Sequence, residues 1–495
     1  MLLYEPRKHR MNVVLVEVLD RVMGAGKTNA ILQWLQPEMN FIFVTPLLSE
    51  AEERIGSVRP DLAVKCPLAI NVKVGEEWVC SKTEDMLHLL QARENIATTH
   101  ALLRGCDERH WKLIQQFGYT IVLDEEINLI EAYDGVPTAD MMWLFDNGHL
   151  SVSGEAGQLV FEDTSVIENF KYADVKEMCR KKMLYAAKRS NKFIVSCLPI
   201  DVLLCSKRVI ILTYMFEGSI LEQFLTLHGV LWKPFDEVSV PHIKPSEYAH
   251  FLTQVNNRYY KPYEKLKLSQ SGWARMTPED VKQVEKTLNN IFSGLHADVC
   301  AFAVPKYYVQ RTGRMKNRLV KPRGKIHQEK QQTWLYPKCR ATNEYANKTT
   351  LVYALDIYPN AAVQAYLKDM GCEVDESKYA VSQLVQWLWR GCIRNGEPMT
   401  VAVLAPRMRK LFEKWLADGY VNVQNNHVEL ESDIDVSHAY EQEAVIAENL
   451  NAVEDKWEGF EEDTSVAQEH NTFPAEFDFG IGDYEMPKLD WEGFN

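Results

Sequence analysis

A glycine-rich stretch near the N-terminus, RVMGAGKTNA at residues 21–30, has the residue types of a phosphate-binding loop. A strand-sized run, VVLVEVL, precedes it and a helical run, TNAILQWLQ, follows it, which is the context such a loop needs. Glycines allow backbone N–H groups and the helix N-terminus to approach phosphate oxygens. We predict that Lys27 binds the β- and γ-phosphates and that the Thr28 hydroxyl coordinates Mg²⁺. The predicted nucleotide-binding residues are Gly24, Ala25, Gly26, Lys27 and Thr28. A helix preceded by a simple glycine turn is the alternative.

A pair of carboxylates follows a second strand-like run in GYTIVLDEEINLI, residues 118–130. Asp124 and Glu125 are therefore expected at the carboxyl edge of a parallel sheet, where ligands bind. We predict that Asp124 holds Mg²⁺ and its water shell, and that Glu125 orients or deprotonates the attacking water. An acidic helix N-terminus is the alternative, because carboxylates there stabilise the helix dipole. With a phosphate loop roughly 100 residues upstream, the pair predicts an NTPase.

Two arginines recur at helical spacing in QLVQWLWRGCIR, residues 383–394. On one continuous helix, Gln386, Arg390 and Arg394 would share a face. Arginines on such a face suit a γ-phosphate that is reached from across a cleft, where charge develops in the transition state. We predict Arg390 as the first choice for this role and Arg394 as the second. The alternative is a basic face that binds DNA phosphates or surface carboxylates.

The most basic part of the chain is residues 306–340, with eleven Lys or Arg and a single acid. Aromatic residues lie near both of its ends, and Pro322 and Gly324 favour a loop or hairpin over a helix. Basic side chains neutralise phosphates and aromatic rings stack on bases, so we predict contact with a single strand. The predicted phosphate ligands are Arg311, Arg314, Lys316, Arg318, Lys321, Arg323 and Lys325. A solvated basic loop is the alternative.

The net charge of −14 is unevenly distributed over the 495 residues. Residues 427–495 carry 20 Asp and Glu against two Lys, whereas the remainder carries 53 basic and 49 acidic side chains. We predict that this acidic segment is disordered. Its repeated WEGF and other aromatic residues suit competition with DNA for a basic groove, or docking on a replication partner. A tail that only improves solubility is the alternative.

The composition argues against a membrane protein and against a secreted one. No run of about 18 apolar residues and no signal peptide is legible. Ten cysteines occur without a CxxC pair, so we expect reduced thiols with neither zinc nor disulfides. The expected location is the cytoplasm, that of the host if the protein is viral.

Strand-sized runs alternate with helical patterns over much of the chain, which favours an α/β fold with parallel sheets covered by helices. The predicted strands of the first part are VVLVEVL, FIFVTP, ENIATTH, TIVLDEE, FIVSCLP and RVIILTY, and those of the second part are ADVCAFAVP, TTLVYAL and TVAVLAP. A long helix is predicted at residues 377–394. We predict a first lobe at 1–225 with an insertion near 133–192 that contains a hairpin, a second lobe at 226–425, and the tail at 426–495.

These motifs, in this order, resemble those of the superfamily-2 (DExx-box) helicases and translocases, in particular those of bacteriophages and large DNA viruses. MGAGKT is similar to their first motif, in which another residue commonly replaces the leading glycine, as Arg21 does here. IVLDEE resembles the DExx box. FIFVTPLLSE, NIATTHALL and VIILTYMF resemble further motifs of the first lobe, and residues 383–394 resemble the arginine-finger motif. Trp389 stands where that last motif more often has glycine, and Arg394 falls one residue late.

The resemblance implies two RecA-like P-loop NTPase lobes, ATP and Mg²⁺ as ligands, and a nucleic-acid track, most favourably for single-stranded DNA. By carry-over it implies backbone contacts from Thr45, Thr98, Thr99 and His100, although His100 could equally be a buried core residue. The implied function is an ATP-dependent DNA helicase or translocase of viral DNA replication or recombination. A terminase-like packaging ATPase and a nucleotide-gated DNA-binding or loading protein are the alternatives.

Overall fold

The computed structural model of the protein describes residues 16–46, 51, 55, 58–74, 77–125, 129–154, 156–162, 172–187, 190–309, 320, 322, 333–337 and 344–418. The chain separates into a unit at Met1–Ser432 and a unit at Asp433–Asn495, and all of the described residues belong to the first. The predicted acidic tail at 426–495 therefore lies outside the described residues. No helix within the described ranges is long and apolar enough to cross a membrane.

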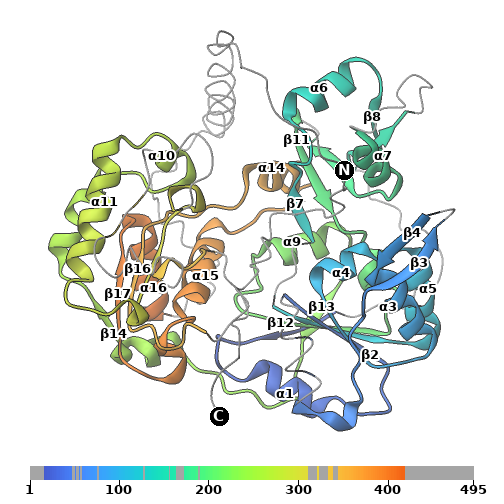
Figure 1. The fold of residues 1–495 in the computed structure, drawn as a ribbon, viewed down its shortest axis with the longest axis horizontal. Helices are drawn as coiled ribbons and strands as arrows, with labels where there is room; N and C mark the ends of the chain where they lie inside the picture. Colours follow the sequence, from blue (N-terminus) through green and yellow to red (C-terminus); the bar gives the residue numbers. More distant parts are fainter. Residues whose placement is uncertain are drawn as a thin grey trace, which may run out of the picture. The chain divides into compact units, whose positions relative to one another are not determined.

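The N-terminal sheet has six parallel strands in the order β13-β1-β12-β6-β2-β5. Figure 1 labels β2, β12 and β13 of this sheet. Its strands are β1 (Val16–Asp20), β2 (Phe41–Thr45), β5 (Ile96–Thr99), β6 (Thr120–Asp124), β12 (Arg208–Thr213) and β13 (Trp232–Pro234). Most residues of the central strands are apolar and buried on both faces because helices cover both faces of the sheet, although β1 also buries Glu17. Strand β12 lies between β1 and β6, so one strand separates the glycine-rich loop from the carboxylate pair.

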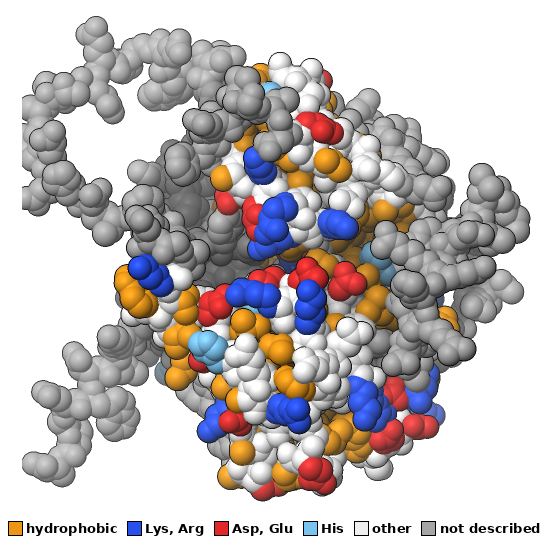
Figure 2. All heavy atoms as spheres, turned by 90° about the vertical axis from the view of Figure 1, so that its right-hand side faces the viewer, with side chains coloured by type: hydrophobic (Ala, Val, Ile, Leu, Met, Phe, Trp, Pro, Cys, Tyr) orange, Lys and Arg blue, Asp and Glu red, His pale blue; other side chains and the backbone are white. Residues whose placement is uncertain are grey.

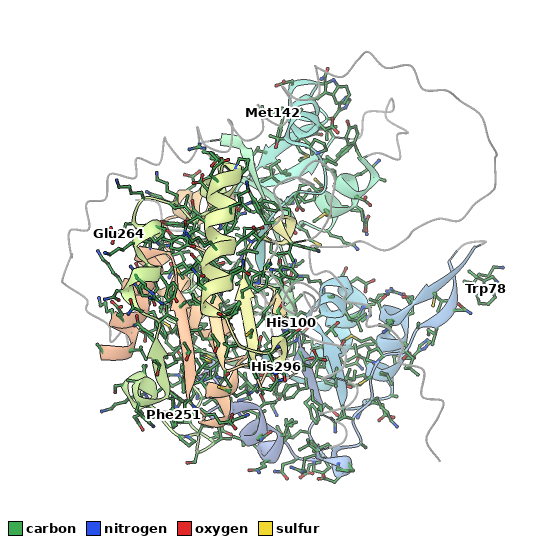
Figure 3. The ribbon with its side chains drawn as sticks, turned by 60° about the vertical axis from the view of Figure 1, so that its left-hand side comes forward. Trp78, His100, Met142, Phe251, Glu264 and His296 are labelled. Carbon is green, nitrogen blue, oxygen red and sulfur yellow. The ribbon has the colours of Figure 1, made fainter. Side chains whose placement is uncertain are left out.

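Helix α1 (Lys27–Trp34) covers one face of this sheet, with Ile31 packed on Leu19 and Phe43. The other face carries α3 (Lys82–Gln91), α4 (His100–Gly105), α5 (Glu108–Phe117) and α9 (Ile220–Leu227). A hairpin of β3 (Ile70–Val74) and β4 (Glu77–Ser81) extends from this part of the chain and carries Trp78, which is 70% exposed (Figure 3).

An insertion between β6 and β12 forms an antiparallel sheet in the order β7-β11-β10-β9-β8. Its strands are β7 (Ile130–Ala132), β8 (Leu150–Ser153), β9 (Gln158–Phe161), β10 (Leu184–Ala187) and β11 (Ser190–Cys197), packed with α6 (Thr138–Asp146) and α7 (Ala173–Arg180). The short helix α8 (Asp201–Leu204) follows β11. The pairing of β8 with β9 confirms the predicted hairpin. The prediction that FIVSCLP continues the parallel alternation was wrong, because β11 pairs antiparallel with β7 and β10.

The C-terminal sheet has four parallel strands in the order β14-β17-β16-β15. They are β14 (Leu252–Gln254), β15 (Cys300–Ala303), β16 (Thr350–Tyr353) and β17 (Met399–Val403). Around them lie α10 (Gln270–Ala274), α11 (Pro278–Ile291), α15 (Glu376–Leu388), α16 (Pro406–Asp418) and the 3₁₀ helices at Pro245–Phe251 and Cys392–Asn395. The predicted α/β class, with parallel sheets covered by helices in two RecA-like lobes, is confirmed.

The lobe limits at residues 225 and 425 stay predictions, although β13, at Trp232–Pro234, is paired with β1 of the N-terminal sheet. Helix α14 (Ala361–Asp369) follows β16 in the chain but packs on the N-terminal side. Its residues Val363 and Leu367 belong to the core that includes Val195 of the insertion. The Tyr366 hydroxyl donates to the carbonyl of Ala156, at 3.1 Å. Helix α14 therefore joins the C-terminal half of the chain to the insertion.

The prediction of one helix over 377–394 was wrong, because α15 ends at Leu388. A Cβ on Gly391 would lie 2.9 Å from the Lys348 carbonyl and 2.8 Å from the Met399 sulfur, so only glycine fits there. The Cys392 amide donates to that same carbonyl at 2.9 Å. This close backbone approach stops the helix, and Gln386, Arg390 and Arg394 do not share one helical face.

Candidate nucleotide and nucleic-acid sites

The glycine-rich loop joins β1 to α1 in a conformation that needs glycine. Gly24 has φ of 78° and Gly26 has φ of 89°, a region that other residues adopt only under strain. The N-terminus of α1 has no side-chain cap and no acidic residue in its first turn, whereas Ser81 caps α3. The first N–H groups of α1 are therefore available to an anion, as the prediction of a phosphate site requires.

The Lys27 ammonium lies inside this loop. It donates to the carbonyl of Arg21 at 2.6 Å and to that of Val22 at 3.3 Å. Burial lowers the pKa of Lys27 to about 8, and the nearby carboxylates of Asp124, Asp20 and Glu125 oppose that shift. The loop thus holds a cation beside the helix N-terminus, in a partly dehydrated setting where an anion would be attracted strongly.

Thr28 and Asp124 meet from opposite ends of the predicted site. The Thr28 hydroxyl lies 3.0 Å from Oδ2 and 3.2 Å from Oδ1 of the Asp124 carboxylate. Hydroxyl and carboxylate oxygens are the ligands that Mg²⁺ prefers, with substrate phosphates completing its shell. The donor set of these two residues therefore fits a magnesium ion.

Glu125 follows β6 in a strained backbone conformation, with φ of 66°. Its amide donates to the carbonyl of Leu212, so the strain is held by the neighbouring strand β12. Its carboxylate Oε1 accepts a hydrogen bond of 3.1 Å from Arg390, whose side chain is 6% exposed. Among the described residues, Nε of Arg390 has no hydrogen-bond partner. Arg390 thus contacts Glu125 at the end of β6 and keeps a second N–H group that could donate to another acceptor.

Arg394 and Trp389 lie against the glycine-rich loop itself. A Cβ placed on Gly24 would lie 3.9 Å from the Trp389 ring and 3.9 Å from both the carbonyl oxygen and Cγ of Arg394. Gln386 is half-buried on α15, and the described part of the chain shows no hydrogen bond between its side chain and this site. The structure therefore brings the other predicted nucleotide-site residues together, and no described hydrogen bond links Gln386 to them.

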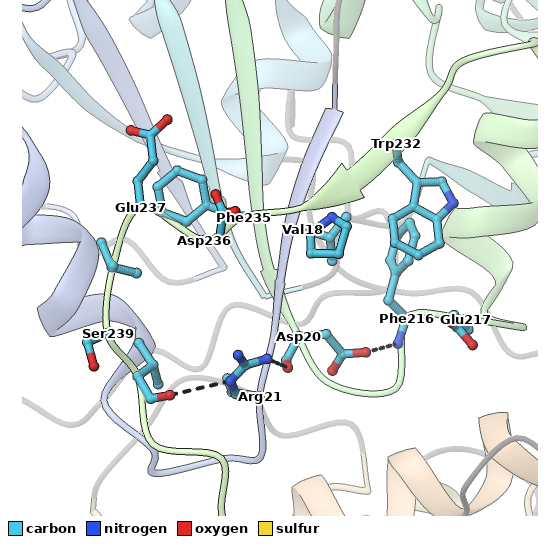
Figure 4. A pocket seen from close by; sticks show the side chains of 13 residues that line it. Val18, Asp20, Arg21, Phe216, Glu217, Trp232, Phe235, Asp236, Glu237 and Ser239 are labelled. Carbon is cyan, nitrogen blue, oxygen red and sulfur yellow. Dashed lines mark hydrogen bonds between the residues drawn. The ribbon is translucent and has the colours of Figure 1, made fainter.

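Asp20 is a residue of this site that sequence reasoning missed. Its carboxylate accepts hydrogen bonds of 2.9 Å from the amides of Met215 and Phe216, and burial raises its pKa (Figure 4). Arg21 donates to the carbonyls of Asp20 and Val240, beside a cavity of about 580 Å³. The sequence signal for this role was an aspartate directly before the loop, at the end of a buried strand. A carboxylate buried there needs hydrogen-bond donors from neighbouring segments.

The predicted nucleic-acid contacts are only partly described. Thr45, Thr98 and His100 are buried at the carboxyl edge of β2 and β5, and the Thr99 hydroxyl caps α4 through the Leu102 amide. Their role as backbone contacts stays a prediction. The basic candidates Arg311, Arg314, Lys316, Arg318, Lys321, Arg323 and Lys325 lie outside the described residues. On the face shown in Figure 2, Lys and Arg side chains lie next to Asp and Glu side chains.

Comparison with known proteins found a prophage-derived relative of this chain. Residues 246–416 match the family described as the YonV C-terminal Rossmann-like domain. Over 441 residues the chain is 26% identical to the SPbeta prophage-derived uncharacterized protein YonV of Bacillus subtilis (strain 168), covering 81% of this chain and 98% of that protein. A solved apo structure of XPD is 12% identical, with a TM-score of 0.42, and the match covers 82% of this chain and 95% of that one. The chain is thus similar to a prophage-derived protein over most of its length, while its fold assignment rests on the strand order described above.

Proposed function

We propose that the protein is an ATP-driven DNA helicase or translocase of superfamily 2 that acts in bacteriophage DNA replication or recombination. The observation that carries the proposal is the 3.1 Å contact between Arg390, after α15, and Glu125, after β6. An arginine that follows a helix of the C-terminal half and reaches a carboxylate at the edge of the N-terminal sheet, beside a phosphate loop, fits a site where hydrolysis is coupled to movement of the lobes.

The residues divide the chemistry between them. The amides of the glycine-rich loop and Lys27 would bind the phosphates, and Thr28 and Asp124, which contact each other, would hold the metal. Bound Mg²⁺ would neutralise charge on the β- and γ-phosphates. Glu125 orients the water that attacks the γ-phosphorus and accepts its proton, while the bond from that phosphorus to the β,γ-bridging oxygen breaks and ADP leaves. Arg390 breaks its hydrogen bond to Glu125 and donates to the γ-phosphate as negative charge develops on that phosphate.

The proposed binding of nucleic acid rests on the basic and aromatic residues of the chain. The basic segment 306–340 would bind backbone phosphates, and Thr45, Thr98, Thr99 and His100 would contact the strand once the lobes move. A single strand is the favoured substrate because the basic segment has aromatic residues at its ends.

The test compares ATP turnover with and without single-stranded DNA for the wild-type chain and for Lys27→Ala. We expect DNA-stimulated turnover in the wild type and its loss in the variant, which has no cation at the phosphates. Unwinding of a tailed duplex, or displacement of a protein block on a single strand, then separates a helicase from a translocase. Full turnover by Lys27→Ala would show that the site is elsewhere. ATP-dependent DNA binding without turnover would favour a nucleotide-gated loading protein instead.

A further inference from the structure

The loop after β12, residues 214–219, contacts both halves of the chain. On the N-terminal side, Asp20 accepts from the amides of Met215 and Phe216. On the C-terminal side, the amide of Asp375 donates to the Gly218 carbonyl at 3.0 Å, and Lys378 donates to the Glu217 carbonyl at 3.3 Å. The loop is therefore held at one end by the strand of the phosphate loop and at the other by the start of α15.

A second connection from this loop is aromatic. The Trp415 indole N–H, on α16, donates to the Tyr214 hydroxyl at 2.7 Å. The Trp415 ring packs edge-on against Trp389, with centroids 5.5 Å apart, and Tyr248 packs edge-on against Trp389 from a centroid distance of 4.7 Å. Trp389 is 2% exposed and Trp415 is fully buried, so this cluster is rigidly packed.

The aromatic cluster ends at the nucleotide site. The Trp389 ring lies 3.9 Å from the position of a Cβ on Gly24, and Val22 of the same loop is buried in the C-terminal core. Arg390 directly follows Trp389 in the chain. A shift of the backbone at Trp389 would therefore move the arginine relative to the carboxylate that it contacts.

We propose that Tyr214 and Trp415 are positioning residues that hold Trp389 against the phosphate-binding loop and so set the placement of Arg390. The inference rests on the proposed function, because the placement matters for the hydrolysis of a nucleotide. The Tyr214 hydroxyl is the acceptor for a buried indole N–H, and its removal leaves that donor without its partner. The cluster then packs in more than one arrangement, and the arginine occupies its place for a smaller fraction of the time.

The test uses Tyr214→Phe, which removes one oxygen atom and keeps the ring. We expect kcat for ATP to fall about tenfold, the scale of one buried hydrogen bond, with KM changed by less than about twofold. Trp415→Phe removes the donor instead of the acceptor, and the double variant should be no slower than the slower single one. In an Arg390→Ala background, Tyr214→Phe should have no further effect on kcat, because the group that it positions is gone.

Tyr263→Phe is the matched control. It also removes one buried hydrogen bond of a tyrosine hydroxyl, the 2.8 Å bond to Thr287 within the C-terminal core. It should lower the midpoint of thermal unfolding about as much as Tyr214→Phe and leave kcat unchanged. Wild-type kcat in an active Tyr214→Phe variant overturns the positioning role and leaves the proposed function intact. Equal loss of kcat in Tyr263→Phe overturns it as well. Absence of turnover in the wild-type chain overturns the proposed function itself.

Discussion

Arg390→Ala tests the proposed hydrolysis step, in which an arginine of the C-terminal half acts beside Glu125 of the N-terminal sheet. The arginine side chain has one described hydrogen bond, to Glu125 at 3.1 Å, and a buried Nε without a partner in the described part of the chain. A γ-phosphate oxygen would supply the missing acceptor in the transition state. We therefore expect the substitution to lower kcat and to leave the KM for ATP nearly unchanged.

The expected loss of kcat is the difference between two free energies: the stabilisation that Arg390 gives the transition state and the cost of breaking its ion pair with Glu125. An arginine that stabilises phosphoryl transfer from across a cleft contributes roughly 10³–10⁵ in rate, or about 4–7 kcal/mol. Arg390 must first leave Glu125, and an ion pair in which one partner is 26% exposed is worth about 1 kcal/mol or somewhat more. The net loss expected for Arg390→Ala is therefore near the lower end, about a thousandfold in kcat.

The assay is steady-state release of phosphate at saturating single-stranded DNA, together with the affinity for ADP alone and for ADP with aluminium fluoride. Arg407→Ala is the matched control, because Arg407 pairs with Asp356 at 3.0 Å in the same lobe. Both variants should lose a similar free energy of unfolding, about 1–2 kcal/mol. Only Arg390→Ala should lose affinity for ADP with aluminium fluoride, and its affinity for ADP alone should stay unchanged.

The reasoning would be refuted by a kcat of Arg390→Ala within about threefold of the wild type. It would also be refuted if ADP affinity fell as much as turnover, because the arginine would then bind ground and transition states alike.

Three further expectations come from the same site and from the charge of the tail. Glu125→Gln should lower kcat by about 10²–10⁴ while fluorescent ATP still binds, because the water loses its base but the phosphate loop is intact; equal loss of binding would contradict this. Asp20→Ala should lower the free energy of unfolding in urea by about 2 kcal/mol or more, because two amides lose their acceptor, and Asp20→Asn should lose less. Deletion of 427–495 should tighten binding to single-stranded DNA at low salt and have little effect at high salt; unchanged affinity at low salt would exclude competition by the tail.

The parallel sheets were predictable because their strands are short apolar runs bounded by polar residues. The carboxyl ends of such strands meet at one edge, so the approach of Thr28 to Asp124 followed from the two motifs alone. What Thr28, Asp124 and the other site residues do chemically stays a prediction.

Other features depend on contacts between distant parts of the chain, and local patterns do not carry these. Helix α15 ends early because Gly391 meets Lys348, a residue some forty positions away. Strand β11 has the composition of a parallel strand, but its partners β7 and β10 run antiparallel to it. The hydrogen bond between Tyr214 and Trp415 joins residues about 200 positions apart, and neither lies in a pattern that indicates the other.

The packing of α14 has a practical consequence for dissecting this protein. A fragment cut to the matched region 246–416 would include α14 without the insertion that covers it. Its apolar residues Val363, Tyr366 and Leu367 would face solvent, an exposed patch of the kind that promotes aggregation. The complementary N-terminal fragment would have an uncovered core at the same place. The two fragments should therefore be insoluble when each is expressed alone and soluble when they are expressed together. In the intact chain, the two halves should unfold in a single cooperative transition.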